Sequence, residues 1–222
     1  MNASLMTIEI VVLLLGLGLL LLDLWTAPER KRLLGYGAAA ALGLVLLYSL
    51  RLDATTAQVA FGGSYVLDGL ALFFKRFFLL AAILVLLLAV EFSDRIAAGI
   101  AEYYSLVVFA LAGMLFAASA ADFTLLFVAI ELITITFYVL TSFQRGLRSS
   151  LEAGVKYLVM GGIASAFMVY GVALVYGTSG TMNFAELAVR SGSQTGAVFH
   201  LGLLLVFLGL GFKIAAFPLH IW

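Results

Sequence analysis

Residues Asp122–Ser142 read DFTLLFVAIELITITFYVLTS, and this stretch decides the class of fold. A helix that crosses a bilayer needs about 20 mostly apolar residues. The stretch has that length, and Glu131 is the one charged side chain between its ends. Glu131 lies nine residues from the start and eleven from the end. The stretch therefore predicts a membrane-spanning helix with a carboxylate near the bilayer midplane.

Six further stretches have, or nearly have, the same length and apolar character. They are Thr7–Trp25, Leu33–Leu50, Leu70–Val90, Tyr104–Ser119, Leu151–Tyr176 and Ala197–Trp222. The first is predicted to be a retained helix and not a signal peptide. The segment before it has no Lys or Arg, and Asp23 follows its apolar core where a cleavage site needs small residues. Only Ala120 and Ala121 separate the stretch that ends at Ser119 from the one that begins at Asp122. This short connection predicts a tight antiparallel pair of helices.

These stretches predict an all-α, polytopic membrane helix bundle of about seven helices. Residues 1–222 are predicted to form a single transmembrane domain, with three helices in 1–95 and four in 104–222.

Composition identifies lipid as the solvent for most of the chain. Hydrophobic residues make up 64% of the 222 and charged residues 11%, with a mean hydropathy of +1.18. Soluble domains have about 45–50% apolar and about 25% charged residues. The 12 basic and 12 acidic residues cancel, and no basic block indicates nucleic acid.

The chain is also predicted to hold no cofactor of its own. It has no Cys, which excludes disulfides and thiolate-bound iron–sulfur clusters. His200 and His220 are separated by about 30 Å along one predicted helix, so they cannot both ligate one haem. Any redox chemistry linked to this protein must take place in another chain.

Basic residues in the short loops predict the orientation of the chain. Six of them, Arg30, Lys31, Arg32, Arg95, Arg145 and Arg148, lie on one side of the membrane, against two, Arg51 and Arg190, on the other. Lys75 and Arg76 lie just inside the third stretch. If they are counted with Arg51 and Arg190, the basic residues on the two sides number 6 and 4. The N-terminus is therefore predicted to face away from the cytoplasm.

The 22 glycines are spread through the predicted helices and favour close helix packing. The GLG sequence at Gly209–Gly211 is not a nucleotide-binding loop. It lacks the GxGxxG spacing and a preceding strand, and Lys213 is followed by Ile214 where a P-loop needs Ser or Thr.

Ionisable residues inside the apolar stretches are the candidates for function. A charge at the centre of a membrane helix costs about 2.5–3.5 kcal/mol on insertion scales, so such residues usually face a bundle interior. Thr134 and Tyr138 follow Glu131 on the same helical face and offer hydroxyls that could hold water. The alternative is a carboxylate that only fixes helix packing, and we favour the functional interpretation.

Lys156 has two open interpretations. It lies about one and a half turns into its stretch, and Glu152 precedes it at i−4, the favourable order for a local ion pair. Lys156 is either part of a functional path, or a partner of Glu152 that extends towards the interface.

Lys213 lies sixteen residues into the last stretch without an acidic residue nearby in the sequence. Pro218 cannot donate a hydrogen bond to the carbonyl of Ile214, and a free carbonyl at membrane depth needs protein or water. With Gly211, this predicts an interrupted, hydrated helix of the kind that holds ions in transporters. His220, about 10 Å further along the same face, suits a proton relay, or an interfacial position.

Together these residues suggest a hypothesis for moving protons. Burial lowers the pKa of a lysine, and a nearby carboxylate raises it. If Glu131 and Lys156 approach and separate, the lysine alternately holds and releases a proton. Lys213 would accept that proton, and His220 would pass it on through water.

Three segments resemble one family. GFKIAAFPLHIW (Gly211–Trp222) resembles the broken-helix motif of the antiporter-like membrane subunits of respiratory complex I. SLEAGVKYLVMGGIASAFMVYGVALVYGTSG (Ser150–Gly180) is similar to the sixth helix and following loop of a bacterial member. DFTLLFVAIELITITFYVL (Asp122–Leu140) matches its fifth helix, and the order and spacing of the three segments are those of the family.

The resemblance implies a proton-translocating subunit of NADH–quinone oxidoreductase in a bacterial inner membrane. By the family motifs, Glu131, Lys156 and Lys213 correspond to the glutamate and two lysines of the proton channel, and His220 to the histidine after the helix break. FMN, iron–sulfur clusters and quinone are expected in partner subunits, and further antiporter-like subunits are expected as neighbours in the membrane.

Family members have two inverted repeats. This chain is expected to cover about the N-terminal half of a family member, so we do not expect it to pump protons alone. Two alternatives remain. A subunit of a multi-subunit sodium/proton antiporter or of a membrane-bound hydrogenase has the same fold and channel residues. A membrane scaffold would use Glu131 only to lock helices together.

Overall fold

The computed structural model describes residues 3–53, 56–93, 99–191, 196–217 and 219. Its helices are α1 (Thr7–Asp23), α2 (Lys31–Leu50), α3 (Gly69–Glu91), α4 (Ile100–Ala118), α5 (Phe123–Thr141), α6 (Arg148–Ser179), α7 (Phe184–Ser191) and α8 (Ala197–Lys213). A β-hairpin is formed by β1 (Gln58–Ala60) and β2 (Tyr65–Leu67), and short 3-10 turns are found at Ala3–Met6, Pro28–Arg30 and Phe61–Gly63.

The predicted all-α membrane fold is confirmed. In the part of the chain that the structure describes, α1 with its preceding turn and α2 to α6 are the six helices long and apolar enough to cross a membrane. The seventh predicted span corresponds to α8, an apolar helix of 17 residues that ends at Lys213. The predicted interruption of this span therefore begins directly after Lys213.

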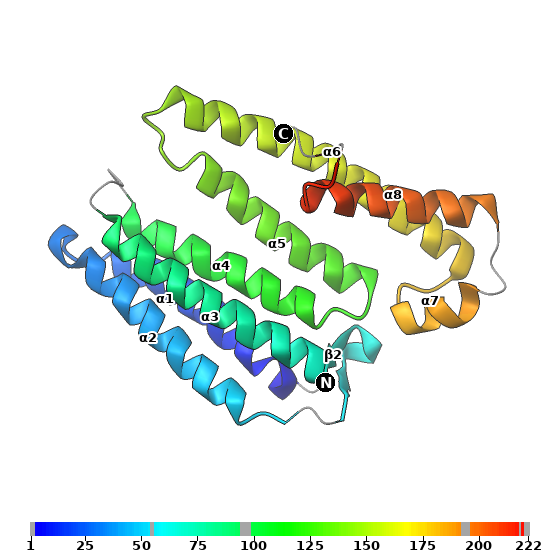
Figure 1. Ribbon diagram of the computed structural model, residues 1–222, viewed down its shortest axis with the longest axis horizontal. Helices are drawn as coiled ribbons and strands as arrows, with labels where there is room; N and C mark the ends of the chain where they lie inside the picture. Colours follow the sequence, from blue (N-terminus) through cyan, green and yellow to red (C-terminus); the bar gives the residue numbers. More distant parts are fainter. Residues whose placement is uncertain (1–2, 54–55, 94–98, 192–195, 218, 220–222) are drawn as a thin grey trace.

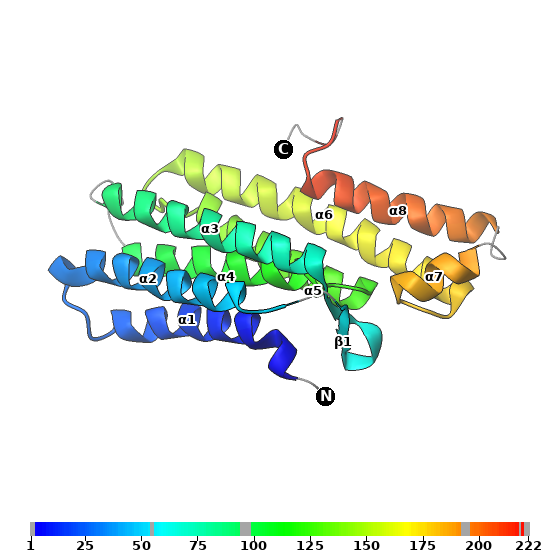
Figure 2. The same ribbon diagram turned by 60° about the horizontal axis from the view of Figure 1, so that its bottom comes forward.

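The helices form two groups that α5 connects. The first four helices pack against one another, α5 contacts both α4 and α6, and α6 pairs with α8 (Figure 1). The same arrangement is seen from a second direction in Figure 2. Leu42, Leu79 and Leu111 are fully buried in the first group, whereas Leu44 and Phe73 are more than half exposed on its outside. Apolar side chains on the outer face are what a lipid environment requires.

A cap of short segments closes one end of the bundle, where α4 ends and α5 begins. Ala121 donates its N–H to the Ser64 carbonyl of the β-hairpin (2.8 Å), and Phe123 donates to Met182 before α7 (3.1 Å). Asp122 caps α5, because its carboxylate accepts the N–H of Leu125 (2.7 Å). The tight connection predicted between the fourth and fifth helices is confirmed.

The hairpin and α7 were not predicted from the sequence. Each strand has only three residues, too few to show an alternating pattern. The hairpin turns through Gly62 and Gly63, which have φ angles of 66° and 98° that favour glycine. α7 has eight residues and lies outside the apolar stretches that identified the other helices.

Glycines bring α6 and α8 close together, as their distribution predicted. A Cβ atom added at Gly171 would lie 2.6 Å from the Gly202 carbonyl oxygen, and one added at Gly209 would lie 2.8 Å from the Ala164 carbonyl oxygen. Gly162 differs, since no described atom lies within 4 Å of its Cβ position. Only some of the glycines therefore serve helix packing.

Candidate functional site

Four polar side chains meet where α5, α6 and α8 face one another: Glu131 and Thr134 of α5, Ser165 of α6 and Lys213 of α8. The Lys213 ammonium lies 3.2 Å from Glu131 Oε1, 3.0 Å from Ser165 Oγ and 3.4 Å from Thr134 Oγ1. Ser165 Oγ donates to the same Glu131 oxygen at 2.6 Å. We refer to these four residues as the Glu131–Lys213 cluster.

Secondary structure places each member of the cluster. Glu131 and Thr134 are three residues apart on α5 and so lie on one face. Lys213 is the last residue of α8, and Ala215 just after it has a left-handed φ of 52°. The Gly211 carbonyl accepts the N–H of Ala216 across this turn (2.8 Å). The helix break thus places an ammonium at a helix C-terminus, where the helix dipole stabilises positive charge.

The cluster is sheltered and its hydrogen bonds are well satisfied. The side chain of Lys213 is 8% exposed and that of Glu131 is 21% exposed. An ammonium has three donors, which matches its three oxygen partners in the cluster. Ser165 both accepts from Lys213 and donates to Glu131, so it bridges the two charged groups. This is a continuous hydrogen-bonded path between a base and an acid.

Tyr138, a predicted supporting residue, lies two turns from Glu131 on α5. Its ring packs edge-on against Tyr157 of α6, with the centroids 4.8 Å apart, and its hydroxyl approaches Gly161. The hydroxyl is buried without a hydrogen-bond partner among the described residues. Tyr138 is therefore next to the cluster, beside Thr134.

Lys156 lies outside the cluster in this structure. Its ammonium is 2.5 Å from the Glu152 carboxylate, and the two side chains are 64% and 66% exposed. Lys156 precedes Ser165 by nine residues, which is about 13 Å along α6. Our hypothesis paired Glu131 with Lys156, but in the structure Glu131 pairs with Lys213. Lys156 instead forms the local ion pair with Glu152.

Two predicted site residues, Pro218 and His220, lie outside the described residues. His200 is exposed near the start of α8, with Nδ1 3.0 Å from the Gly196 carbonyl oxygen. The described residues contain no group of three or more His, Cys, Asp or Glu that could hold a metal.

Ser165 is the cluster residue that the sequence did not reveal. It is one small hydroxyl in a helix rich in glycine and alanine, and no charge distinguishes it. The only available signal was its position on the helix that also carries Lys156.

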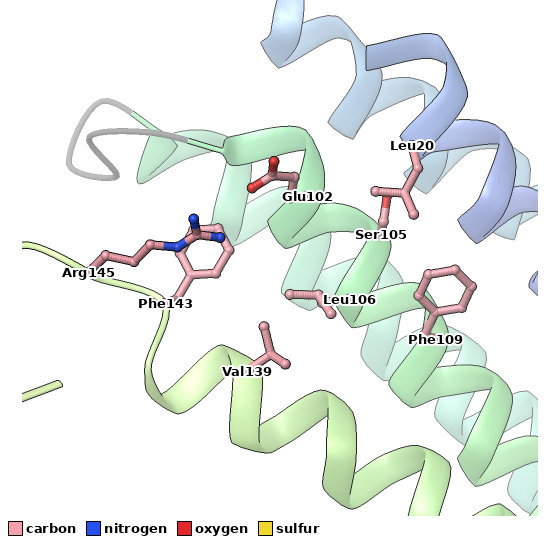
Figure 3. A pocket seen from close by; sticks show the side chains of 8 residues that line it. All are labelled: Leu20, Glu102, Ser105, Leu106, Phe109, Val139, Phe143 and Arg145. Atoms are coloured by element: carbon pink, nitrogen blue, oxygen red, sulfur yellow. The ribbon is translucent and has the colours of Figure 1, made fainter. Parts of the chain in front are cut away.

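A separate pocket lies between α1, α4 and the end of α5 (Figure 3). Its lining is largely apolar, including Leu106 and Phe109 of α4 and Phe143 after α5, with Glu102 and Arg145 at one end. It contains no member of the Glu131–Lys213 cluster.

Comparisons with known proteins agree with the fold. Residues 120–222 match the family described as NADH:quinone oxidoreductase/Mrp antiporter, TM. The whole chain is 39% identical to NADH-quinone oxidoreductase subunit N of Desulforamulus reducens, covering 46% of that protein, and 40% identical to subunit N of Erythrobacter litoralis, covering 47%. The chain thus spans about half the length of these relatives.

Solved structures show the same similarity. A chain of respiratory complex I from Thermus thermophilus matches 97% of this chain with a TM-score of 0.76 and 30% identity, over 46% of its own length. A chain of the archaeal membrane-bound sulfane sulfur reductase matches 100% of it with a TM-score of 0.82 and 24% identity, over 47% of its own length, and supports the fold alone. The predicted resemblance is confirmed: the chain is related over its whole length to the antiporter-like membrane subunits, and it matches about the N-terminal half of subunit N.

Proposed function

We propose that this chain is part of a proton-translocating membrane subunit of an NADH–quinone oxidoreductase. The observation that carries the proposal is the Glu131–Lys213 cluster, in which Ser165 joins a sheltered ammonium to a carboxylate. Ionisable residues held this way between membrane helices mark ion paths. The relatives named subunit N support the choice of complex.

The cluster can transfer a proton from Lys213 to Glu131 through the Ser165 hydroxyl. Lys213 gives a proton from Nζ to Ser165 Oγ while Ser165 gives its own proton to Glu131 Oε1. One N–H bond breaks, one O–H bond forms on Glu131, and the serine is unchanged. The step turns an ion pair into a neutral lysine and a neutral carboxylic acid. If Lys213 then takes up a proton from one side of the membrane and Glu131 releases its proton to the other side, one proton has crossed the cluster.

Lys156 and His220 remain proposed members of the path on either side of the cluster, and Gly211 and Pro218 remain the proposed helix break between Lys213 and His220. We propose that the N-terminus faces away from the cytoplasm of a bacterial inner membrane, as the loop charges predict. Electron transfer from NADH to quinone would take place in partner subunits that hold FMN and iron–sulfur clusters. In this proposal the chain contributes proton movement to an enzyme complex and no redox chemistry of its own.

The experiment that tests this proposal is purification of the protein from native membranes in mild detergent. We expect flavin- and iron–sulfur-containing subunits and NADH–quinone activity to co-purify with it. Antiporter subunits without redox partners would instead favour a sodium/proton antiporter, the other protein named in the matching family description.

Replacing Ser165 with Ala is expected to slow proton translocation at least about tenfold, because a positioned proton-transfer group contributes a factor of about 10² or more. The bridge between Lys213 and Glu131 would be lost, while their direct contact of 3.2 Å would remain. Acidification of inverted membrane vesicles, per NADH oxidised, measures the effect.

Two variants control for this substitution. Ser165→Thr keeps a hydroxyl and is expected to recover most of the rate. Ser150→Ala removes an exposed serine hydroxyl on the same helix, 2.8 Å from the Thr141 carbonyl oxygen, and is expected to be neutral. Equal rates for the two alanine variants would show that Ser165 does not carry protons.

A further inference from the structure

A second buried ionic cluster lies in the first group of helices, away from the Glu131–Lys213 cluster. The Lys75 ammonium of α3 is 2.6 Å from Glu9 Oε1 of α1, and both side chains are 0% exposed. The Tyr65 hydroxyl of β2 lies 3.0 Å from the same carboxylate oxygen and 2.7 Å from Lys75 Nζ. We call Glu9, Tyr65 and Lys75 the Glu9–Lys75 cluster.

Packing alone does not readily account for such a cluster. Moving two charges out of water costs several kcal/mol per ion, and well-packed apolar residues often stabilise a fold as well or better. In a bilayer, a cluster of this kind is retained most often where it carries function.

The hydrogen bonding of the Glu9–Lys75 cluster is incomplete. Glu9 Oε2 is buried without a hydrogen-bond partner among the described residues. Ser119 lies beside the cluster, because its carbonyl accepts the N–H of Val66 (2.9 Å) in the hairpin and its hydroxyl interacts with that of Tyr65. Buried oxygens of this kind are satisfied by water. Water at Glu9 Oε2 would give the carboxylate a route for losing a proton.

The cluster lies close to the end of the bundle at which α1 begins. Lys75 is the seventh residue of α3, about 9 Å along that helix from its start. The Tyr65 hydroxyl also lies 3.0 Å from the carbonyl oxygen of Leu5, in the turn before α1. Asp68, at the start of α3, is the other carboxylate that acts on Lys75. Burial and the Glu9 charge raise the pKa of Tyr65, so its hydroxyl stays neutral and able to donate.

We propose that Glu9, Tyr65 and Lys75 form a second proton-exchange site, which takes up and releases protons at the end of the bundle where α1 begins. The step is a transfer from Lys75 Nζ to Glu9 Oε1, in which an N–H bond breaks and an O–H bond forms. Tyr65 holds the two groups in position. Rotation of the protonated carboxyl group then brings its proton to the Oε2 side, where water accepts it and Glu9 returns to the carboxylate, and a proton taken up by Lys75 Nζ restores the ammonium. The inference rests on the proposed function as a proton-translocating subunit.

The test uses the double variant Glu9→Gln/Lys75→Met in the complete complex, with translocation measured per NADH oxidised in inverted vesicles. Changing both residues leaves no unpaired buried charge, so assembly is expected to survive. Translocation is expected to fall at least about tenfold, as for loss of a proton-transfer group. Asp23→Asn is the matched control, because it neutralises the carboxylate that pairs with Lys31 (2.7 Å) at the other end of α1.

A second readout reports on the site directly. The infrared difference spectrum between acidic and alkaline pH is recorded for the parent complex and for Glu9→Gln, and one of the parent's protonated-carboxyl bands is expected to be missing from Glu9→Gln. Tyr65→Phe keeps both charges and is expected to slow translocation even if the double variant does not assemble.

The proposal is overturned if the assembled double variant, or Tyr65→Phe, translocates at the parental rate, or if Glu9→Gln retains every protonated-carboxyl band of the parent. Glu131→Gln, measured in parallel, separates this failure from a failure of the proposed function. If Glu131→Gln stops translocation and the Glu9–Lys75 variants do not, only the second site is rejected. If neither has an effect, proton translocation by this chain is rejected as well.

Discussion

Replacing Lys213 with Met is expected to abolish redox-driven proton translocation while the complex still assembles. Lys213 supplies the ammonium that contacts Glu131, Ser165 and Thr134 at 3.2, 3.0 and 3.4 Å. Methionine has a similar length and no exchangeable proton, so the relay through Ser165 loses its donor. Loss of a proton-transfer group of this kind corresponds to a fall in rate of about 10² or more.

Acidification of inverted vesicles at matched rates of NADH oxidation measures the effect of Lys213→Met. The double variant Glu131→Gln/Lys213→Met removes both charges and tests whether an unpaired carboxylate, and not the missing relay, is responsible for any loss. Lys31→Met is the control for losing a lysine from an ion pair, because Lys31 pairs with Asp23 at the connection between α1 and α2. Parental translocation in assembled Lys213→Met would reject the proposed mechanism and favour the scaffold alternative.

The helices could be predicted from the sequence because lipid imposes a simple rule on length and composition. The span expected at Asp122–Ser142 is the helix Phe123–Thr141, and the span expected at Leu151–Tyr176 is Arg148–Ser179. The β-hairpin could not be predicted in this way. It is held by long-range bonds, such as that from the Asn183 side chain to the Gly63 carbonyl (2.9 Å), which join residues 120 positions apart.

The functional residues were predictable one at a time, but their contacts were not. Glu131 and Lys213 are conspicuous as charges in apolar helices, yet they are 82 residues apart in the sequence, and only the packing of α5 against α6 and α8 brings them together. Lys156 was a nearer candidate partner, but it lies on an exposed face of α6. Lys75 lies just inside the third apolar stretch and affected only the count of basic residues on the two sides of the membrane. Nothing in the sequence pointed to Glu9 as its partner, because only the fold brings the two together.

Replacing Gly171 with Leu is expected to separate α6 from α8 and to disable the site without touching a polar residue. A Cβ atom at Gly171 would lie 2.6 Å from the Gly202 carbonyl oxygen and 2.7 Å from the Val206 nitrogen, both backbone atoms of α8. Backbone cannot move aside as a side chain can, so the helices must part. Overpacking of this kind costs about 1–3 kcal/mol or more. Lys213, at the end of α8, would then lose its position beside Ser165.

Gly177→Leu is the matched control, since it makes the same substitution six residues further along α6, where no described atom lies within 4 Å of the Cβ position. Thermal aggregation of the purified complex, followed by size-exclusion chromatography, and translocation in vesicles are the two measurements. Gly171→Leu is expected to lower both the temperature at which the complex aggregates and the rate of translocation, and Gly177→Leu neither. If Gly171→Leu is as stable as its control and still translocates, the close crossing of α6 and α8 does not position Lys213. A variant that remains stable but no longer translocates would instead show that a small shift of α8 is enough to break the contact between Lys213 and Ser165.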